Sequence, residues 1–230
     1  MIVGSGMLAR AFAPHFANDP GVLVYAAGVS NSGCIDDREF AREEASFERS
    51  VAQIGVRATV VYFGTCSAED PAARATPYVR HKLRMEARVR EQPQHLVVRL
   101  PQVVGRTPNP HTLLNYLHAR IARSERFALW TGARRYVIDL DDVVSAVLYL
   151  FALRESSPAR MLNVANSRSY STREIVGALE RATGKQAIFD EVARGSDYTI
   201  NIDEALPLFA AAGVRFDDGY LDRVIRKYYG

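Results

Sequence analysis

The N-terminal segment MIVGSGMLARAF constrains the fold most, because it joins a short apolar strand to a helix through a glycine-rich turn. The turn over residues 4–9 has the pattern G-x-G-x-x-A. Gly4 and Gly6 allow a tight backbone path, and Ala9 is small enough for the helix to approach the strand. A pyrophosphate could approach such a turn closely, beside the positive end of the helix. A tight turn without any ligand has the same pattern, so the motif alone leaves both interpretations open.

Further along the chain, short apolar runs alternate with helical patterns. Strands are expected in GVLVYAAG, ATVVYFGT, QHLVVRL and RRYVIDL, with helices between them. This alternation predicts a parallel sheet covered by helices over residues 1–157. From about Pro158 the pattern changes to a short strand, MLNVAN, and the helices STREIVGALERATGK and LDRVIRKYY. We therefore expect a small C-terminal α/β part over residues 158–230 that packs on the sheet as a lid.

Composition excludes few functions but favours an ordinary globular protein of 230 residues. The chain has 48% hydrophobic and 24% charged residues and a net charge of only +3, which does not favour a nucleic-acid partner. Cys34 and Cys66 lack the spacing of metal ligands, so we expect no metal site, and we assign the five histidines no role. No apolar run has the ~20 residues of a membrane span, and the N-terminus has no signal-peptide pattern. We expect a soluble, cytoplasmic protein.

The segment TPYVRHK, residues 76–82, predicts a helix that begins with a functional pair. Thr76 is a good N-cap and Pro77 suits the first helical position, so Tyr78 and Lys82 lie one turn apart on the same face. A lysine ammonium beside a phenol lowers the tyrosine pKa from its ordinary value of about 10, which favours general acid–base chemistry. Thr65, at the end of the strand VVYFGT, could bind the same substrate oxygen. Chance alone places a tyrosine and a lysine at this spacing in many helices.

The order of the motifs along the chain is more specific to one family than any single motif. GSGMLA, VYAAG, VVYFGTCS, YVRHK, RLPQVVG, RRYVIDLDDV and LNVAN follow one another as in the short-chain dehydrogenase/reductase superfamily. The chain resembles its extended branch of nucleotide-sugar epimerases, dehydratases and keto-sugar reductases. The resemblance implies a Rossmann-like, doubly wound parallel sheet and NAD or NADP as cofactor. It also implies that Tyr78 is the acid or base, that Lys82 binds the nicotinamide ribose and tunes Tyr78, and that Thr65 orients the substrate.

The same resemblance assigns binding roles to further residues. Expected cofactor contacts, besides Tyr78 and Lys82, are Gly4, Ser5, Gly6, Met7, Leu8, Ala27, Gly28 and Pro101. Expected substrate contacts are Gln102 and Arg135, the latter suited to a diphosphate because its guanidinium can bind in a bidentate manner. Trp130 could stack on a nucleotide base or pack in the core.

One departure from the family has a specific consequence. The stretch HFANDPG is too short to hold the family's second and third strands, and GVLVYAAGVSNS resembles the fourth. We therefore expect a sheet that lacks two N-terminal strands and leaves the adenosine half of the cofactor more exposed. The residue that selects NAD or NADP normally ends the second strand and has no counterpart here. Asp19 is near in number, but it lies in the shortened connection.

The resemblance implies NAD(P)-dependent redox chemistry on a nucleotide sugar, either keto-sugar reduction or redox epimerisation. The alternative is a non-catalytic dinucleotide-binding regulatory or partner protein, which the missing strands suggest and the complete set of Thr65, Tyr78 and Lys82 argues against. Relatives commonly form homodimers through helices that flank the active site, and this chain could do the same.

Overall fold

The computed structural model describes residues 1–153 and 159–230. Its main sheet has five parallel strands in the order β1-β2-β3-β4-β8, with β8 at the edge opposite β1. The strands are β1 (Ile2–Val3), β2 (Val22–Tyr25), β3 (Thr59–Thr65), β4 (His95–Leu100) and β8 (Ala159–Asn163). This parallel, helix-covered sheet confirms the Rossmann-like fold expected from the sequence.

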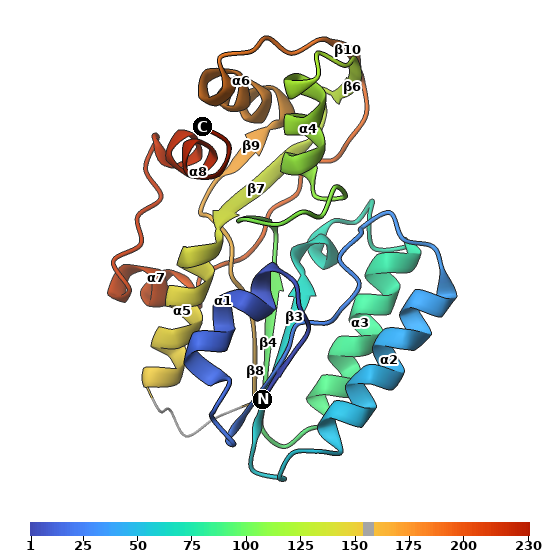
Figure 1. Cartoon of the computed structure of the whole chain (residues 1–230), viewed down its shortest axis with the longest axis vertical. Helices are drawn as coiled ribbons and strands as arrows, with labels where there is room; N and C mark the ends of the chain where they lie inside the picture. Colours follow the sequence, from blue (N-terminus) through green and yellow to red (C-terminus); the bar gives the residue numbers. More distant parts are fainter. Residues whose placement is uncertain (154–158) are drawn as a thin grey trace.

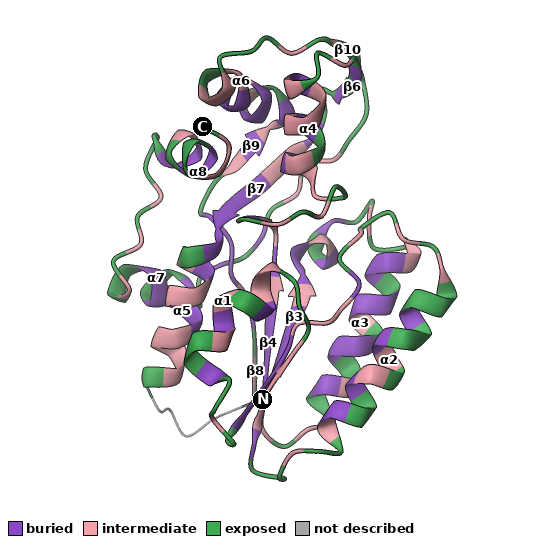
Figure 2. Ribbon diagram, in the orientation of Figure 1, coloured by how far each residue is buried: buried purple, intermediate pink, exposed green. Residues whose placement is uncertain are grey.

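Helices cover both faces of the main sheet (Figure 1). On one face, α1 (Met7–Phe16) and α5 (Leu140–Ala152) share a core with Val24, Val61 and Val98. On the other face, α2 (Asp37–Val51) and α3 (Pro77–Arg90) pack on alternate residues of the same strands, including Leu23, Val60 and Val97. Figure 2 shows the buried residues gathered on the strands and on the helix faces turned toward them.

The N-terminal edge of the sheet is shortened as expected. Within the described ranges, β1 pairs with β2 alone, and β2 takes the place next to β1 that the fourth strand has in the order 3-2-1-4-5-6. The helix α1 nevertheless lies on the face opposite α2 and α3. Because the chain steps in the same direction from β1 to β2 as from β2 to β3, the β1-α1-β2 crossover has the opposite hand to β2-α2-β3. Such inversions are rare, and here α1 leads directly to β2 through a short connection.

A smaller unit lies above the carboxyl ends of the main strands (Figure 1). It contains a three-stranded sheet, a two-stranded sheet and three helices around its own apolar core. Its elements are β5 (Gln102–Val104), α4 (Leu113–Ala122), β6 (Phe127–Trp130), β7 (Arg134–Asp139), β9 (Ser169–Ser171), α6 (Thr172–Thr183), β10 (Phe189–Val192) and α8 (Tyr220–Tyr229). A short α7 (Leu206–Ala211) packs near α5, and the 3-10 helix Cys66–Glu69 follows β3.

The two units do not divide the chain at one point. The boundary expected between residues 157 and 158 lies outside the described residues. MLNVAN, expected in the C-terminal part, contributes β8 to the main sheet, whereas RRYVID, expected in the main sheet, forms β7 of the smaller unit. Periodicity identifies a strand but not its partner, which depends on tertiary packing. None of the helices in the described part of the chain is long and apolar enough to cross a membrane.

Candidate functional site

One cavity of about 1010 Å³ lies between the carboxyl ends of the main strands and the smaller unit. All the residues expected from the sequence to bind or act line this cavity: Gly4, Ser5, Gly6, Met7, Leu8, Ala27, Gly28, Thr65, Tyr78, Lys82, Pro101, Gln102 and Arg135. Carboxyl ends of parallel strands are the usual ligand site of such folds. The cavity brings the residues together, while their individual roles stay predictions.

The glycine turn leaves open space beside the start of α1. Gly4 has a φ of +123°, and a Cβ there would lie 2.6 Å from the carbonyl oxygen of Ala26, so the position requires glycine. Gly6, by contrast, faces open space, with nothing within 4 Å of an added Cβ. No side chain caps α1 at Gly6, nor the short α7 or α8, whereas side chains cap α2, α3, α4, α5 and α6. The first N–H groups of α1 are therefore available to an anion in the cavity.

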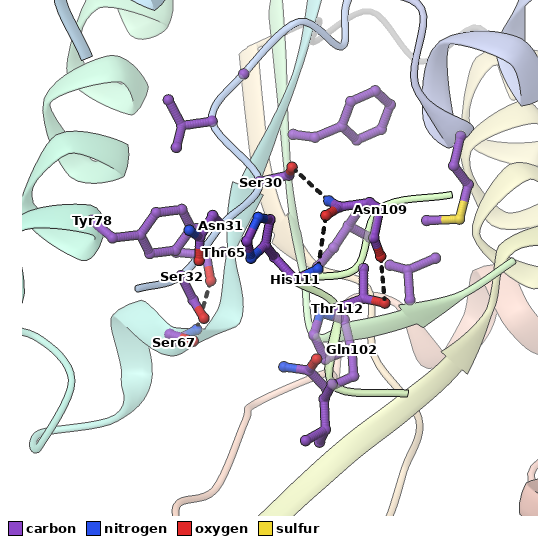
Figure 3. A pocket seen from close by; sticks show the side chains of 18 of the residues that line it. Ser30, Asn31, Ser32, Thr65, Ser67, Tyr78, Gln102, Asn109, His111 and Thr112 are labelled. Carbon is purple, nitrogen blue, oxygen red and sulfur yellow. Dashed lines mark hydrogen bonds between the residues drawn. The ribbon is translucent and has the colours of Figure 1, made fainter. Parts of the chain in front are cut away.

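Tyr78 and Thr65 lie close together, across the pocket from Gln102 (Figure 3). The Oγ1 of Thr76 accepts a hydrogen bond from the Val79 N–H at 3.3 Å, and this cap places Tyr78 in the first turn of α3. Thr65 ends β3, and its Oγ1 accepts from the Ser67 N–H at 3.1 Å. Burial raises the pKa of Tyr78 well above its ordinary value, and the Thr65 hydroxyl opposes this shift only in part. Tyr78 is therefore protonated at neutral pH.

Lys82 does not lower the pKa of Tyr78 in this structure, contrary to the expectation from their spacing. Its Nζ donates to the Tyr62 hydroxyl at 3.0 Å and to the Glu43 Oε1 at 3.3 Å. Burial lowers the pKa of Lys82, and the charge of Glu43 opposes that shift. A Cβ on Gly28 would lie 2.6 Å from the Lys82 Nζ, so glycine at this position makes room for the ammonium. The spacing predicts a shared helix face but not the direction of the lysine head group.

Another part of the cavity wall is polar and includes residues that the sequence reasoning missed. The Nδ2 of Asn109 donates to the Ser30 Oγ at 3.0 Å, and its Oδ1 accepts from the His111 N–H at 2.9 Å (Figure 3). The sequence could have indicated these residues, because Ser30 lies in the polar loop that follows β2 and Asn109 in the polar loop that follows β5. Arg135 donates from Nη1 to the carbonyl oxygens of Arg134 and Ser196, at 2.7 and 3.3 Å. Trp130, 43% exposed, also lines the cavity.

Glu43 and His81 were also missed. Both are fully buried beside Lys82, and the Nε2 of His81 lies 2.9 Å from the Glu43 Oε2. Glu43 is three residues after Phe40 and four before Phe47, so the helical period places it on the apolar face of α2. A charged residue on that face was the available signal. The described residues contain no group of three or more His, Cys, Asp or Glu side chains suited to hold a metal ion.

Solved structures with this fold share little sequence with the chain. RMD from Pseudomonas aeruginosa, complexed with NADPH, has a TM-score of 0.73 at 16% identity, covering 98% of this chain and 94% of that chain. UDP-glucuronic acid 4-epimerase from Bacillus cereus, in complex with NAD, has a TM-score of 0.70 at 14% identity, with 91% and 71% covered. UDP-glucose 4-epimerase from Thermus thermophilus, also with NAD, has a TM-score of 0.64 at 19% identity, with 95% and 78% covered.

These likenesses confirm the fold, and a sequence match confirms the family. Among curated proteins, none matches the chain in sequence. The expected NAD or NADP cofactor agrees with the cofactors bound in these structures and with the description of the matching family. The model of that family matches residues 10–165, more than half of the 230-residue chain. The chain therefore belongs to the NAD dependent epimerase/dehydratase family.

Proposed function

We propose that the chain catalyses NAD(P)-dependent oxidation or reduction at a sugar carbon of a nucleotide-activated sugar. The reaction is a keto-sugar reduction or the redox half of an epimerisation. The observation that carries the proposal is that the glycine turn, Thr65, Tyr78, Lys82 and Arg135 all line one cavity. An uncapped helix end, an acid–base side chain and a guanidinium are the groups that a dinucleotide and a sugar diphosphate require.

The residues present fit a dinucleotide. The open space at Gly6 and the uncapped start of α1 suit a pyrophosphate, and Lys82 reaches the cavity wall where it could bind a ribose hydroxyl. Ala27, Gly28 and Pro101 would line the rest of the cofactor's path. When bound, the nicotinamide supplies or accepts the hydride.

The acid–base step belongs to Tyr78. In reduction, its hydroxyl gives a proton to the carbonyl oxygen of the sugar while the carbonyl carbon gains a hydride, so the product is an alcohol. In oxidation, the same oxygen of Tyr78 takes the proton back. Thr65 holds the substrate oxygen beside Tyr78, and Gln102 and Arg135 bind the nucleotide diphosphate.

Turnover tests the proposal. NADH and NADPH oxidation is followed at 340 nm with keto-sugar nucleotides carrying uridine, thymidine or guanosine diphosphate. We expect turnover with a member of this panel, and a loss of about 100-fold or more in kcat for Tyr78→Phe. Tyr149→Phe, on α5 outside the cavity wall, is the matched control and should keep full activity. Equal turnover by Tyr78→Phe would refute the mechanism.

A non-catalytic dinucleotide-binding protein is the second candidate, because β1 forms the sheet edge in the described ranges and leaves the adenosine side open. Saturable binding of NADH or NADPH without turnover of any sugar nucleotide in the panel would favour this candidate.

A further inference from the structure

A buried carboxylate lies directly behind Lys82. Glu43 is 0% exposed and has four hydrogen-bond contacts. Its Oε1 accepts from the Tyr62 hydroxyl at 2.8 Å and from the Lys82 Nζ at 3.3 Å. Its Oε2 accepts from the Val29 N–H at 2.6 Å and lies 2.9 Å from the His81 Nε2. Groups from the loop after β2, from β3 and from α3 therefore converge on one carboxylate.

The four contacts hold Glu43 in its ionised form. An ionised carboxylate only accepts hydrogen bonds, so the His81 Nε2 must carry a proton. Burial disfavours the charge, but the hydrogen bond from His81 and the charge of Lys82 outweigh it and lower the pKa of Glu43 to about 2. Glu43 is therefore anionic at neutral pH.

Lys82 depends on this anion. A buried ammonium without an opposite charge tends to lose its proton. Glu86, on the same helix, is committed to Arg99, with Nε–Oε1 and Nη2–Oε2 distances of 3.0 and 2.6 Å. Among the described residues, Glu43 is the carboxylate in contact with the Lys82 Nζ. The other titratable groups around this pair are Tyr25, Tyr62, Tyr78, His81 and Glu86.

Geometry also fixes where the lysine head group lies. An ammonium has three N–H donors, and the contacts with Glu43 and Tyr62 use two of them. Because Lys82 lines the cavity, the remaining donor is available to a ligand there. Only the charged form has a third N–H to offer.

We infer that Glu43 is a positioning residue that keeps Lys82 charged and fixes its ammonium so that one N–H remains for a ribose hydroxyl of the cofactor. His81 and Tyr62 hold the Glu43 carboxylate in place. The ribose contact rests on the proposed function, whereas the control of Lys82 by Glu43 is a property of the protein alone.

Lysine NMR tests the control directly, because the chain has only three lysines, Lys82, Lys185 and Lys227. Lysine labelled with ¹³C at Cε gives three signals to titrate, and Lys82→Arg identifies the signal of Lys82. We expect Glu43→Gln to lower the Lys82 pKa by about 1–3 units. Glu48→Gln, a change of an exposed glutamate on the same helix that pairs with Arg88, should leave the Lys82 pKa unchanged. An unchanged Lys82 pKa in Glu43→Gln would overturn the inference.

The wild-type titration keeps the inference testable if Glu43→Gln does not fold. Lys82 should keep its proton at pH 8 although it is buried, and loss of the proton below that pH would overturn the inference. Neither NMR result requires cofactor or substrate, so it is independent of the proposed function.

Kinetics add a readout that a purely structural role would not produce. In Glu43→Gln, kcat/KM should approach the wild-type value below the lowered Lys82 pKa and fall about tenfold per pH unit above it, because only protonated Lys82 is competent. A loss by the same factor at every pH would contradict the inference.

Discussion

Replacing Gly6 with alanine should weaken dinucleotide binding while leaving the fold intact. The backbone of Gly6 has φ −74° and ψ −174°, which alanine adopts readily, and nothing lies within 4 Å of the added Cβ. Alanine is a poorer N-cap than glycine, but it also restricts the unfolded chain, so the net change in unfolding free energy should stay within about 1 kcal/mol.

The added methyl group would occupy the space where the pyrophosphate approaches the first N–H groups of α1. Losing one charge-assisted hydrogen bond and part of the helix-dipole interaction costs about 2–3 kcal/mol of binding free energy. This corresponds to an increase in Kd of about 30- to 150-fold. The loss should be similar for NADH and NADPH, because the two cofactors share the pyrophosphate.

Isothermal titration calorimetry with NADH measures the Kd, and thermal unfolding checks the fold. Gly55→Ala is the matched control, since its added methyl also meets open space but Gly55 lies outside the cavity wall. A Gly6→Ala variant that binds NADH as tightly as wild type would refute the assignment of this turn to the pyrophosphate.

Three further predictions concern the neighbouring residues. Gly4→Ala forces a φ of +123° on alanine and brings its Cβ to 2.6 Å from the Ala26 carbonyl oxygen. The variant should lose about 2–3 kcal/mol of unfolding free energy, which lowers the Tm by about 4–12 °C, and an unchanged Tm would contradict this. Gly28→Ala places a methyl group 2.6 Å from the Lys82 Nζ, so the ammonium must move and calorimetry should show at least about a tenfold weaker NADH affinity; wild-type affinity would argue against a role for Lys82 in binding. Glu43 has a pKa of about 2 in the folded protein against an ordinary value of 4.5. Because the folded-state pKa is lowered, this stabilisation, about 3 kcal/mol in all, is complete above pH 4.5 and is lost as the pH falls toward 2. The free energy of unfolding, measured with urea between pH 5 and pH 3, should therefore depend less on pH in Glu43→Gln than in wild type. An identical pH dependence in the two proteins would contradict the lowered pKa of Glu43.

Most of the fold followed from local patterns in the sequence. Apolar runs such as ATVVYFGT and the N-cap before Tyr78 are decided by neighbouring residues, and HFANDPG is simply too short for two strands. The inverted β1-α1-β2 crossover and the place of β7 in the smaller unit could not be predicted in this way, because both depend on which surfaces pack together.

In the candidate site, too, some features could be predicted from local sequence and others depend on tertiary packing. Every residue chosen from motif order lines the cavity. Most of them do so because the carboxyl ends of the main parallel strands meet at one edge of the sheet, whereas Arg135 lies at the start of β7 in the smaller unit. The partner of Lys82 could not be found from spacing within α3, since Glu43 comes from α2 and Tyr62 from β3. Burial, which decides the direction of the Tyr78 pKa, is likewise a tertiary property.

Hydride transfer to a sugar nucleotide tests the central claim most directly. The protein is mixed with NADH or NADPH carrying deuterium at C4, in each of its two stereochemical forms, and with a keto-sugar nucleotide, and the product is analysed by mass spectrometry after a single turnover. We expect deuterium in the sugar of the wild-type product with one of the two stereochemical forms, and its appearance should be at least about 100-fold slower with Tyr78→Phe. Bound cofactor and bound sugar nucleotide without any transfer of deuterium, or equally fast transfer by Tyr78→Phe, would contradict the claim.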